Sequence, residues 1–121
     1  MKKRKSSSPN LCGVIHLPPL PGSIRASQLY RKTGVSHSQR ISFIVEKAIK
    51  EAIFLEKSGF DSLIIENFGD SPFLKESIHG ETLSAFSIIT QEVRKEIQIP
   101  IGVNVLRNDA MSAISIASVT G

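Results

Sequence analysis

The sequence predicts an α/β fold made of three consecutive βα units around a parallel sheet. Three short apolar runs, at residues 11–16, 62–66 and 101–106, each precede a longer segment. In those longer segments apolar residues recur three or four positions apart, which is typical of amphipathic helices. Alternation of strand and helix favours parallel strands joined by right-handed crossovers. With 121 residues, 40% of them hydrophobic and 21% charged, the chain has the size and composition of one globular domain.

The first unit begins with a strand at Leu11–His16 and a loop that holds three prolines between residues 17 and 23. The polar stretch after this loop, up to about residue 38, predicts no further element. Ser36 and Gln39 have the spacing of a capping box, so a helix is expected to start there. Gly59 ends that helix as a left-handed cap. Its apolar face consists of Ile41, Ile44, Val45, Ala48, Ile49, Ala52 and Ile53.

The second and third units follow the same plan. A strand is expected at 62–66, where a nearly unbroken apolar run indicates burial on both faces, and another at 101–106. The second helix, at about 81–97, packs through Phe86, Ile89, Val93 and Ile97. Asn108 or Asp109 caps the third helix. The residues of that helix expected to face the sheet are Ala110, Ala113, Ile114 and Ala117.

The positive charge of the chain comes from its first residues. Lys and Arg number 15 against 11 Asp and Glu, and four of the basic residues lie within residues 2–5. Residues 1–10 are therefore expected to be a disordered basic tail, and residues 11–121 are close to neutral. This balance argues against a nucleic-acid-binding face, whereas the tail permits a weak peripheral contact with an anionic membrane.

Compartment is indicated by the cysteine count and by the apolar runs. Cys12 is the single cysteine, which excludes an internal disulfide and fits a reducing compartment. Cys12 is expected to be buried in the first strand and chemically silent. The apolar run after the basic tail matches a secretory signal poorly, and no run approaches the length of a membrane span. We therefore expect a cytoplasmic protein, with possible attachment to a membrane surface through the tail.

Polar residues gather where the predicted strands end, which is where βα folds place their active sites. We expect His16 and Glu66 to be catalytic, since both can take part in acid–base chemistry. Side chains alternate along a strand, so Glu66 and Asn104 should share the face opposite the helix-packed residues. The residues expected to bind a ligand are Asn67, Asp70, Asn104 and Arg107.

Each of these residues also has a structural alternative. His16 can simply bond to the proline loop, and Glu66 can form an ion pair with Arg107. Asp70 can cap the turn before Pro72, and Asn104 can satisfy backbone groups. Asn108 and Asp109 are most often helix caps, and His37 and His79 lie in polar loops, where solvation is expected.

No cofactor is indicated by the motifs. The sequence contains no metal-ligand spacing, no Walker loop and no dinucleotide fingerprint. His16, Glu66 and Asp70 would bind a metal only if the fold brought them together. The cofactor is therefore left unknown and no metal is predicted.

The end of the chain bears on the choice between an open sheet and a (βα)8 barrel. Gly59 precedes the second strand by three residues, and Gly121 has the same place after the third helix, where a fourth strand would begin. A complete barrel needs about 250 residues. We therefore expect residues 11–121 to be the N-terminal segment of a TIM (β/α)8-type barrel, with three βα units.

Three long segments resemble one known family. They are GVIHLPPLPGS at 13–23, IIENFGDSPF at 64–73 and GVNVLRNDAMSAISIASVTG at 102–121. In this order they closely resemble the BtpA family over residues 11–121. The resemblance implies a fold similar to a TIM barrel and a role in photosystem I biogenesis. It also implies that this chain lacks the loops after strands 7 and 8, where such barrels bind phosphate.

Three functions follow from these observations. The first is a BtpA-like accessory factor that assists assembly or stability of photosystem I. The second is a TIM-barrel enzyme acting on a phosphosugar- or nucleoside-like molecule through His16 or Glu66. The third is a truncated, non-functional fragment of a barrel protein. In each case three strands leave two open sheet edges, so we expect an oligomer or a chain that needs a missing C-terminal half.

Overall fold

Three parallel strands form one sheet in the order β1-β2-β3, as the alternation predicts. The computed structural model describes residues 10–121, so the predicted tail lies outside the described residues except for its last position. The strands are β1 at Cys12–His16, β2 at Ser62–Glu66 and β3 at Ile101–Asn104. The third strand is two residues shorter than predicted because the chain turns after Asn104 and enters a loop. The α/β class and the parallel βα arrangement are confirmed.

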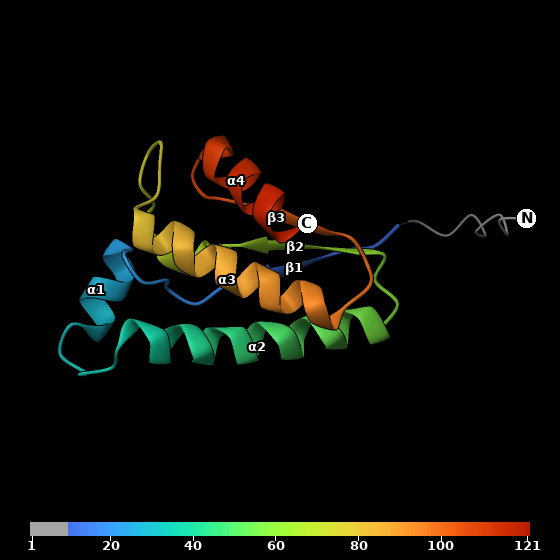
Figure 1. Cartoon of the computed structure of the whole chain (residues 1–121), viewed down its shortest axis with the longest axis horizontal. Helices are drawn as coiled ribbons and strands as arrows, with labels where there is room; N and C mark the ends of the chain where they lie inside the picture. The colour runs from blue at the N-terminus through green and yellow to red at the C-terminus, as the bar shows by residue number, and fades with distance from the viewer. Residues whose placement is uncertain (1–9) are drawn as a thin grey trace, which may run out of the picture.

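Each strand is followed by a helix, and a short helix is inserted in the first connection (Figure 1). The helices are α1 at Ile24–Tyr30, α2 at His37–Lys57, α3 at Gly80–Glu96 and α4 at Ala110–Thr120, with a 3-10 turn η1 at Phe68–Asp70. The prediction of no element before residue 36 is wrong for α1. Ser23 caps this helix by accepting a hydrogen bond from the Ala26 amide, and the helix buries only Ala26.

The start and end of α2 confirm the predicted local signals. The Ser36 side chain accepts from the Gln39 amide, and the Gln39 side chain accepts from the Ser36 amide, which completes the capping box. At the other end Gly59 has a φ of 93°, the left-handed conformation expected of a helix cap. The helix α2 runs antiparallel to β1, the strand it follows, and packs alongside α3 (Figure 1).

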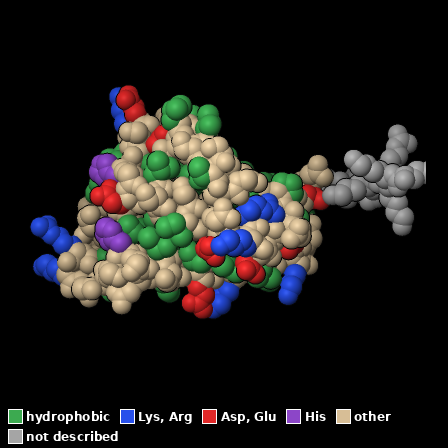
Figure 2. Space-filling model, in the orientation of Figure 1, with side chains coloured by type: hydrophobic (Ala, Val, Ile, Leu, Met, Phe, Trp, Pro, Cys, Tyr) green, Lys and Arg blue, Asp and Glu red, His purple; other side chains and the backbone are tan. Residues whose placement is uncertain are grey.

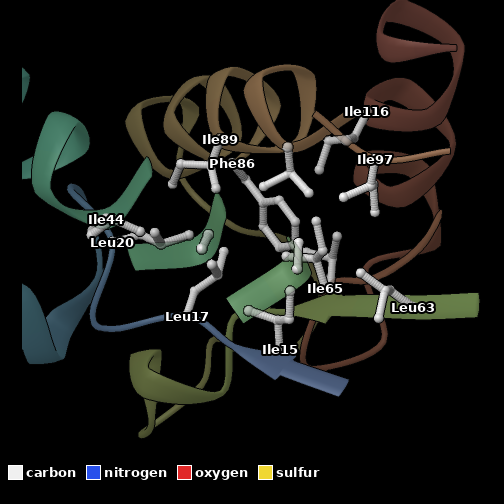
Figure 3. Close-up of a cluster of buried hydrophobic side chains, with 14 residues drawn as sticks. Ile15, Leu17, Leu20, Ile44, Leu63, Ile65, Phe86, Ile89, Ile97 and Ile116 are labelled. Carbon is white, nitrogen blue, oxygen red and sulfur yellow. The ribbon is translucent and has the colours of Figure 1, made fainter. Parts of the chain in front are cut away.

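The core lies between the sheet and the α2–α3 layer. Ile15, Leu63 and Ile65 project from β1 and β2 toward Phe86 and Ile89 of α3 (Figure 3). All four predicted α3 core residues have no exposed side-chain surface: Phe86, Ile89, Val93 and Ile97. Burial of such large apolar side chains is the main favourable term in folding, so this layer determines which face of the sheet is covered.

The opposite face of the sheet is open. Its residues alternate with the buried ones, and Val14 in the middle of β1 is 48% exposed. Ile64, its partner on β2, is half-buried, so the expectation that β2 is buried on both faces is wrong for the described chain. Cys12 lies on this same face and is exposed, which corrects the prediction that it is buried. The reason is parity, because Cys12 is two residues from Val14 and four from His16.

The helix α4 is rotated relative to its predicted orientation. Ser112 and Ile116 are its buried residues, whereas Ile114, which was expected to face the sheet, is 63% exposed. Small and apolar residues surround this helix almost completely, so no single stripe distinguishes its inner face. Ser112, which bonds to the cap residue Asp109, lies on the buried side together with Ile116. None of the helices within residues 10–121 is long and apolar enough to cross a membrane.

Candidate functional site

Three polar side chains form a row across the carboxyl ends of the strands, on the open face of the sheet. His16, Glu66 and Asn104 are register partners on β1, β2 and β3. His16 Nε2 lies 2.7 Å from Glu66 Oε1, and Asn104 Nδ2 donates to Glu66 Oε2 at 3.0 Å. The parity argument therefore placed these residues together correctly. Both oxygens of Glu66 are engaged, so the carboxylate joins the other two residues into one unit.

The imidazole of His16 is held on two sides. Its ring stacks on Phe68, with 4.5 Å between centroids and 19° between planes. Because a carboxylate oxygen accepts hydrogen bonds, the neutral ring has its proton on Nε2, facing Glu66. The Nδ1 lone pair is then available on a side chain that is 54% exposed. This arrangement leaves an oriented base at the open end of the sheet.

An aromatic and basic groove continues from this row toward β3. Phe68 contacts Phe73, with 6.4 Å between their ring centroids. Phe73 lines a shallow groove together with Asn104 and Arg107. Asn104 therefore belongs both to the polar row and to the groove. The groove offers an aromatic surface, an amide and a guanidinium, which are groups that suit a planar or anionic ligand.

Asn67 is buried beneath this surface and does not join the row. Its side-chain oxygen accepts from the Leu106 amide at 2.7 Å, and its Nδ2 donates to the Leu106 carbonyl at 3.1 Å. The same Nδ2 lies 3.1 Å from Asp70 Oδ2. Asn67 is 1% exposed, so its polar atoms serve the loops after β2 and β3. Its predicted contact with a ligand stays a prediction, and the geometry favours a positioning role.

Asp70 holds the proline loop against η1. Its Oδ1 accepts from the Leu20 amide at 2.7 Å, and its residue is 4% exposed. Burial raises the pKa of Asp70 above its ordinary value, although the bonds from Leu20 and Asn67 act in the opposite direction. Asp70 thus links the loop after β1 to the loop after β2 through a hydrogen bond. Its predicted role in ligand binding stays a prediction.

Gly69 allows these two loops to touch. Its amide donates to the Leu17 carbonyl at 3.0 Å. A Cβ at this position would lie 2.4 Å from the Leu17 oxygen and 2.8 Å from Pro18 carbonyl carbon. Only glycine fits such a close backbone approach. The close approach fixes Phe68, and with it the stacked ring of His16, relative to the end of β1.

Of the two residues predicted to cap α4, Asn108 and Asp109, the structure shows Asp109 as the cap. Its carboxylate accepts from the Ser112 amide at 3.0 Å and from the Ile78 amide at 2.8 Å. Burial acts to raise the pKa of Asp109, but the hydrogen bonds from Ser112 and Ile78 outweigh it and lower the pKa. Asn108 precedes the cap with a φ of 68°. Asp109 therefore connects the loop before α3 to α4.

Two structural alternatives can now be compared with the geometry. Glu66 pairs with His16, and within residues 10–121 it forms no ion pair with Arg107, which is exposed. His16 bonds Glu66 and stacks on Phe68, and neither contact is with the proline loop. In the described part of the chain no three His, Cys, Asp or Glu side chains converge as a metal site.

The prediction missed Phe68, Phe73 and the backbone of Leu106 as parts of the site. The signal available for the first two was the presence of two phenylalanines in the loop that follows a strand with a terminal glutamate. His79, expected in solvent, is exposed and its Nδ1 lies 2.9 Å from the Gly22 carbonyl oxygen. His37 is exposed as expected.

Comparison with known proteins gives one family. The model of the BtpA family matches residues 7–121. An uncharacterized protein of Pyrococcus horikoshii is 43% identical over 107 residues, covering 88% of this chain and 37% of its own length. The photosystem I biogenesis protein BtpA of Synechocystis is 38% identical over 109 residues, covering 90% of this chain and 34% of its own length.

The relatives extend beyond bacteria and archaea. An uncharacterized mitochondrial protein of Caenorhabditis elegans is 30% identical over 125 residues, covering 99% of this chain and 41% of its own length. This chain therefore spans only about a third to two fifths of the length of these curated relatives. No solved structure matches it.

Proposed function

The chain belongs to the BtpA family, and on that basis we propose that it supplies the acid–base part of a small-molecule site in a (βα)8-type barrel. The observation that carries the proposal is the His16–Glu66 pair at the carboxyl ends of adjacent parallel strands. Sites in barrels of this type are built at that end of the strands. A fold alone hosts many activities, so the His16–Glu66 pair and its surroundings carry this proposal, not the barrel fold.

The chemistry proposed for His16 is proton transfer at Nδ1. Glu66 holds the Nε2–H, so the imidazole keeps one orientation and one tautomer. Imidazole is the side chain that most often acts as a general base or acid in enzymes. Glu66 acts through His16 and through Asn104, whose amide bonds its second oxygen. In this proposal Glu66 orients the base, and Asn104 presents its remaining polar atoms to the ligand.

The substrate class we propose is a phosphosugar- or nucleoside-like molecule. Arg107 can pair with an anionic group through the planar fork of its guanidinium. Phe73 lines the same groove and Phe68 lies beside it, which suits the face of a base or a sugar ring. The open face supports the barrel proposal, because further strands would cover Val14 and Ile64 there and enclose the site.

A second candidate is an accessory role in photosystem I biogenesis, which is favoured by the Synechocystis relative of that name. Relatives also occur in Pyrococcus horikoshii and, as a mitochondrial protein, in Caenorhabditis elegans. A shared small-molecule activity accounts for all three more simply than a shared assembly role. A chimera tests the second candidate, with this chain replacing the matched part of Synechocystis BtpA and photosystem I content as the readout. Restoration that survives His16→Gln would favour an assembly role independent of the acid–base pair.

The first proposal is tested by ligand binding followed through backbone amide NMR shifts. The folded chain is titrated with a panel of sugar phosphates, nucleosides and nucleotides. At least one compound is expected to shift the amides at 16, 66–68 and 104–107, and His16→Gln is expected to weaken its binding about tenfold or more. Glu46→Gln, which breaks an exposed pair with Lys50 on α2, is the control that leaves binding unchanged. Shifts confined to other surfaces would contradict the proposal.

A further inference from the structure

A second pocket lies away from the strand ends, between α1 and the beginning of α2. Its volume is about 470 Å³, and three of its lining side chains are basic: Arg31, His37 and Arg40. None of them takes part in the His16–Glu66–Asn104 row. The α1 helix that forms one wall is an insertion in the first βα connection, so this pocket is a local feature of that connection.

Arg40 is held in a defined plane at this pocket. Its guanidinium carbon lies 3.8 Å from the centroid of the Tyr30 ring, and its Nη2 donates to the Tyr30 hydroxyl. The Nε of Arg40 is buried and has no hydrogen-bond partner. This Nε is covered by the protein itself, so a ligand in the pocket would meet the other parts of the Arg40 guanidinium that line it. Stacking on tyrosine also restricts the guanidinium before any ligand arrives.

The charges around the pocket are not balanced locally. Within residues 10–121 neither Arg31 nor Arg40 has a carboxylate partner. An adjoining groove shares Arg31 and His37 with the pocket and adds Lys32, His79 and a single acid, Glu81. Blue and purple side chains accordingly gather at the end of the molecule where α1 lies (Figure 2). Several cations that share one concave surface raise the local concentration of anions.

We infer that the α1–α2 pocket binds the phosphate group of a phosphorylated small molecule. Arg31 and Arg40 supply guanidinium donors in the planar geometry that phosphate oxygens accept. The pocket also lies beside the positive end of the 21-residue helix α2, which adds a weaker attraction for an anion. The inference does not rest on the proposed function, because the two sites share no residue.

The test uses the 121-residue chain with inorganic phosphate as the first probe, at constant ionic strength. Amide shifts near residues 31, 37 and 40 are expected to saturate. Arg31→Gln and Arg40→Gln are each expected to weaken binding about tenfold or more, the loss typical of one charge-assisted hydrogen bond. Arg25→Gln removes one charge from the same helix at an exposed position outside the pocket lining, and it should leave binding unchanged.

A second arm separates a phosphate ester from free phosphate. Glucose 6-phosphate should bind at the same amides, whereas glucose should not. Arg31→Gln leaves the Tyr30–Arg40 stack intact, so it remains decisive if Arg40→Gln does not fold. Two results would overturn the inference: equal weakening by Arg25→Gln and Arg31→Gln, or shifts that map elsewhere on the chain. Shifts confined to the strand ends would likewise overturn the inference, and their loss in His16→Gln would assign them to the other site.

Discussion

The side chain of Asn67 makes a two-bond pair with the backbone of Leu106. Its oxygen accepts from the Leu106 amide at 2.7 Å, and its nitrogen donates to the Leu106 carbonyl at 3.1 Å. The amide group thus takes the place of a peptide unit and continues the pairing of β2 with β3 after the third strand has ended at Asn104. This pair fixes the position of Leu106, and so of the loop that carries Arg107, relative to the end of β2.

Asn67→Ala should lower the free energy of unfolding by roughly 2–3 kcal/mol, because it leaves the partly buried backbone of Leu106 without its side-chain partner and removes one of the hydrogen bonds to Asp70. Asn104→Ala is the matched control on the exposed face, with an expected loss of about 0.5 kcal/mol or less. Urea unfolding at one fixed protein concentration measures both. Equal losses for the two variants would show that the Asn67 pair does not stabilise the loops.

Gly69→Ala should destabilise the fold by about 3 kcal/mol or more, the upper end of the usual cost of overpacking. The reason is that the added Cβ meets rigid backbone of the proline loop at 2.4 Å. Gly80→Ala is the control, since a Cβ at Gly80 meets nothing within 4 Å and the position begins α3. That substitution should be neutral or stabilise by up to about 1 kcal/mol. Similar melting temperatures for the two variants would refute the tight contact between the loops.

Stability should fall in acid because of Asp109. Its pKa in the folded state is lower than the ordinary value of 3.8, so the unfolded chain binds more protons in that range. The stabilisation is present above about 3.8 and is lost as the pH falls through the folded-state value. Urea unfolding from neutral pH to pH 3 should show a smaller loss for Asp109→Asn than for the parent chain. An unchanged acid slope would contradict the assignment.

The pKa of Asp70 has the opposite linkage. Since burial raises this pKa, the folded state binds the proton more tightly, and stability falls as the pH rises from 3.8 through the raised value. Asp70→Asn removes the contribution of this carboxyl group to the pH dependence of stability. The free energy of unfolding of this variant, plotted against pH, should therefore diverge from that of the parent in the direction opposite to Asp109→Asn. Divergence in the same direction would show that burial does not dominate at Asp70.

The isolated chain should associate as its concentration rises. The sheet leaves the edges of β1 and β3 unpaired within the described residues, and Val14 is 48% exposed on its open face. Val14→Glu should reduce association, whereas Val119→Glu, at a 68% exposed position on α4, should not. Light scattering over a tenfold concentration range measures the mass. A well-behaved monomer with a cooperative urea transition would contradict this expectation.

The strands, the two long helices and the polar row at the carboxyl ends of the strands could all be predicted from the sequence. Period-two alternation places Glu66 and Asn104 on the face of the sheet opposite to that of Ile65 and Val103. The parallel register then brings Glu66 and Asn104 into line with His16. The helix α1 was missed because it has only seven residues and buries only Ala26, so its pattern is too short to show an amphipathic stripe, and a single cap at Ser23 defines its start. The orientation of α4 was missed because its sides are nearly equivalent in polarity.

The loops could not be predicted in the same way. The Asn67–Leu106 pair joins residues 39 positions apart, and the bond from Leu20 to Asp70 joins residues 50 apart. No local pattern encodes such contacts, so Asn67 and Asp70 could not be distinguished from ligand-binding residues. Parity places Cys12 on the same face as Val14 and His16. Its exposure then follows only once it is known which face of the sheet the helices cover.

The tautomer of His16 tests the central claim most directly. If Glu66 holds the Nε2–H, long-range proton–nitrogen NMR of the ring, above the pH range where imidazole titrates, will show a protonated Nε2 and an unprotonated Nδ1. Glu66→Ala should remove this preference and give a mixture of tautomers. A proton on Nδ1 in the parent chain, or a tautomer ratio unaffected by Glu66→Ala, would contradict an oriented acid–base pair at the strand ends.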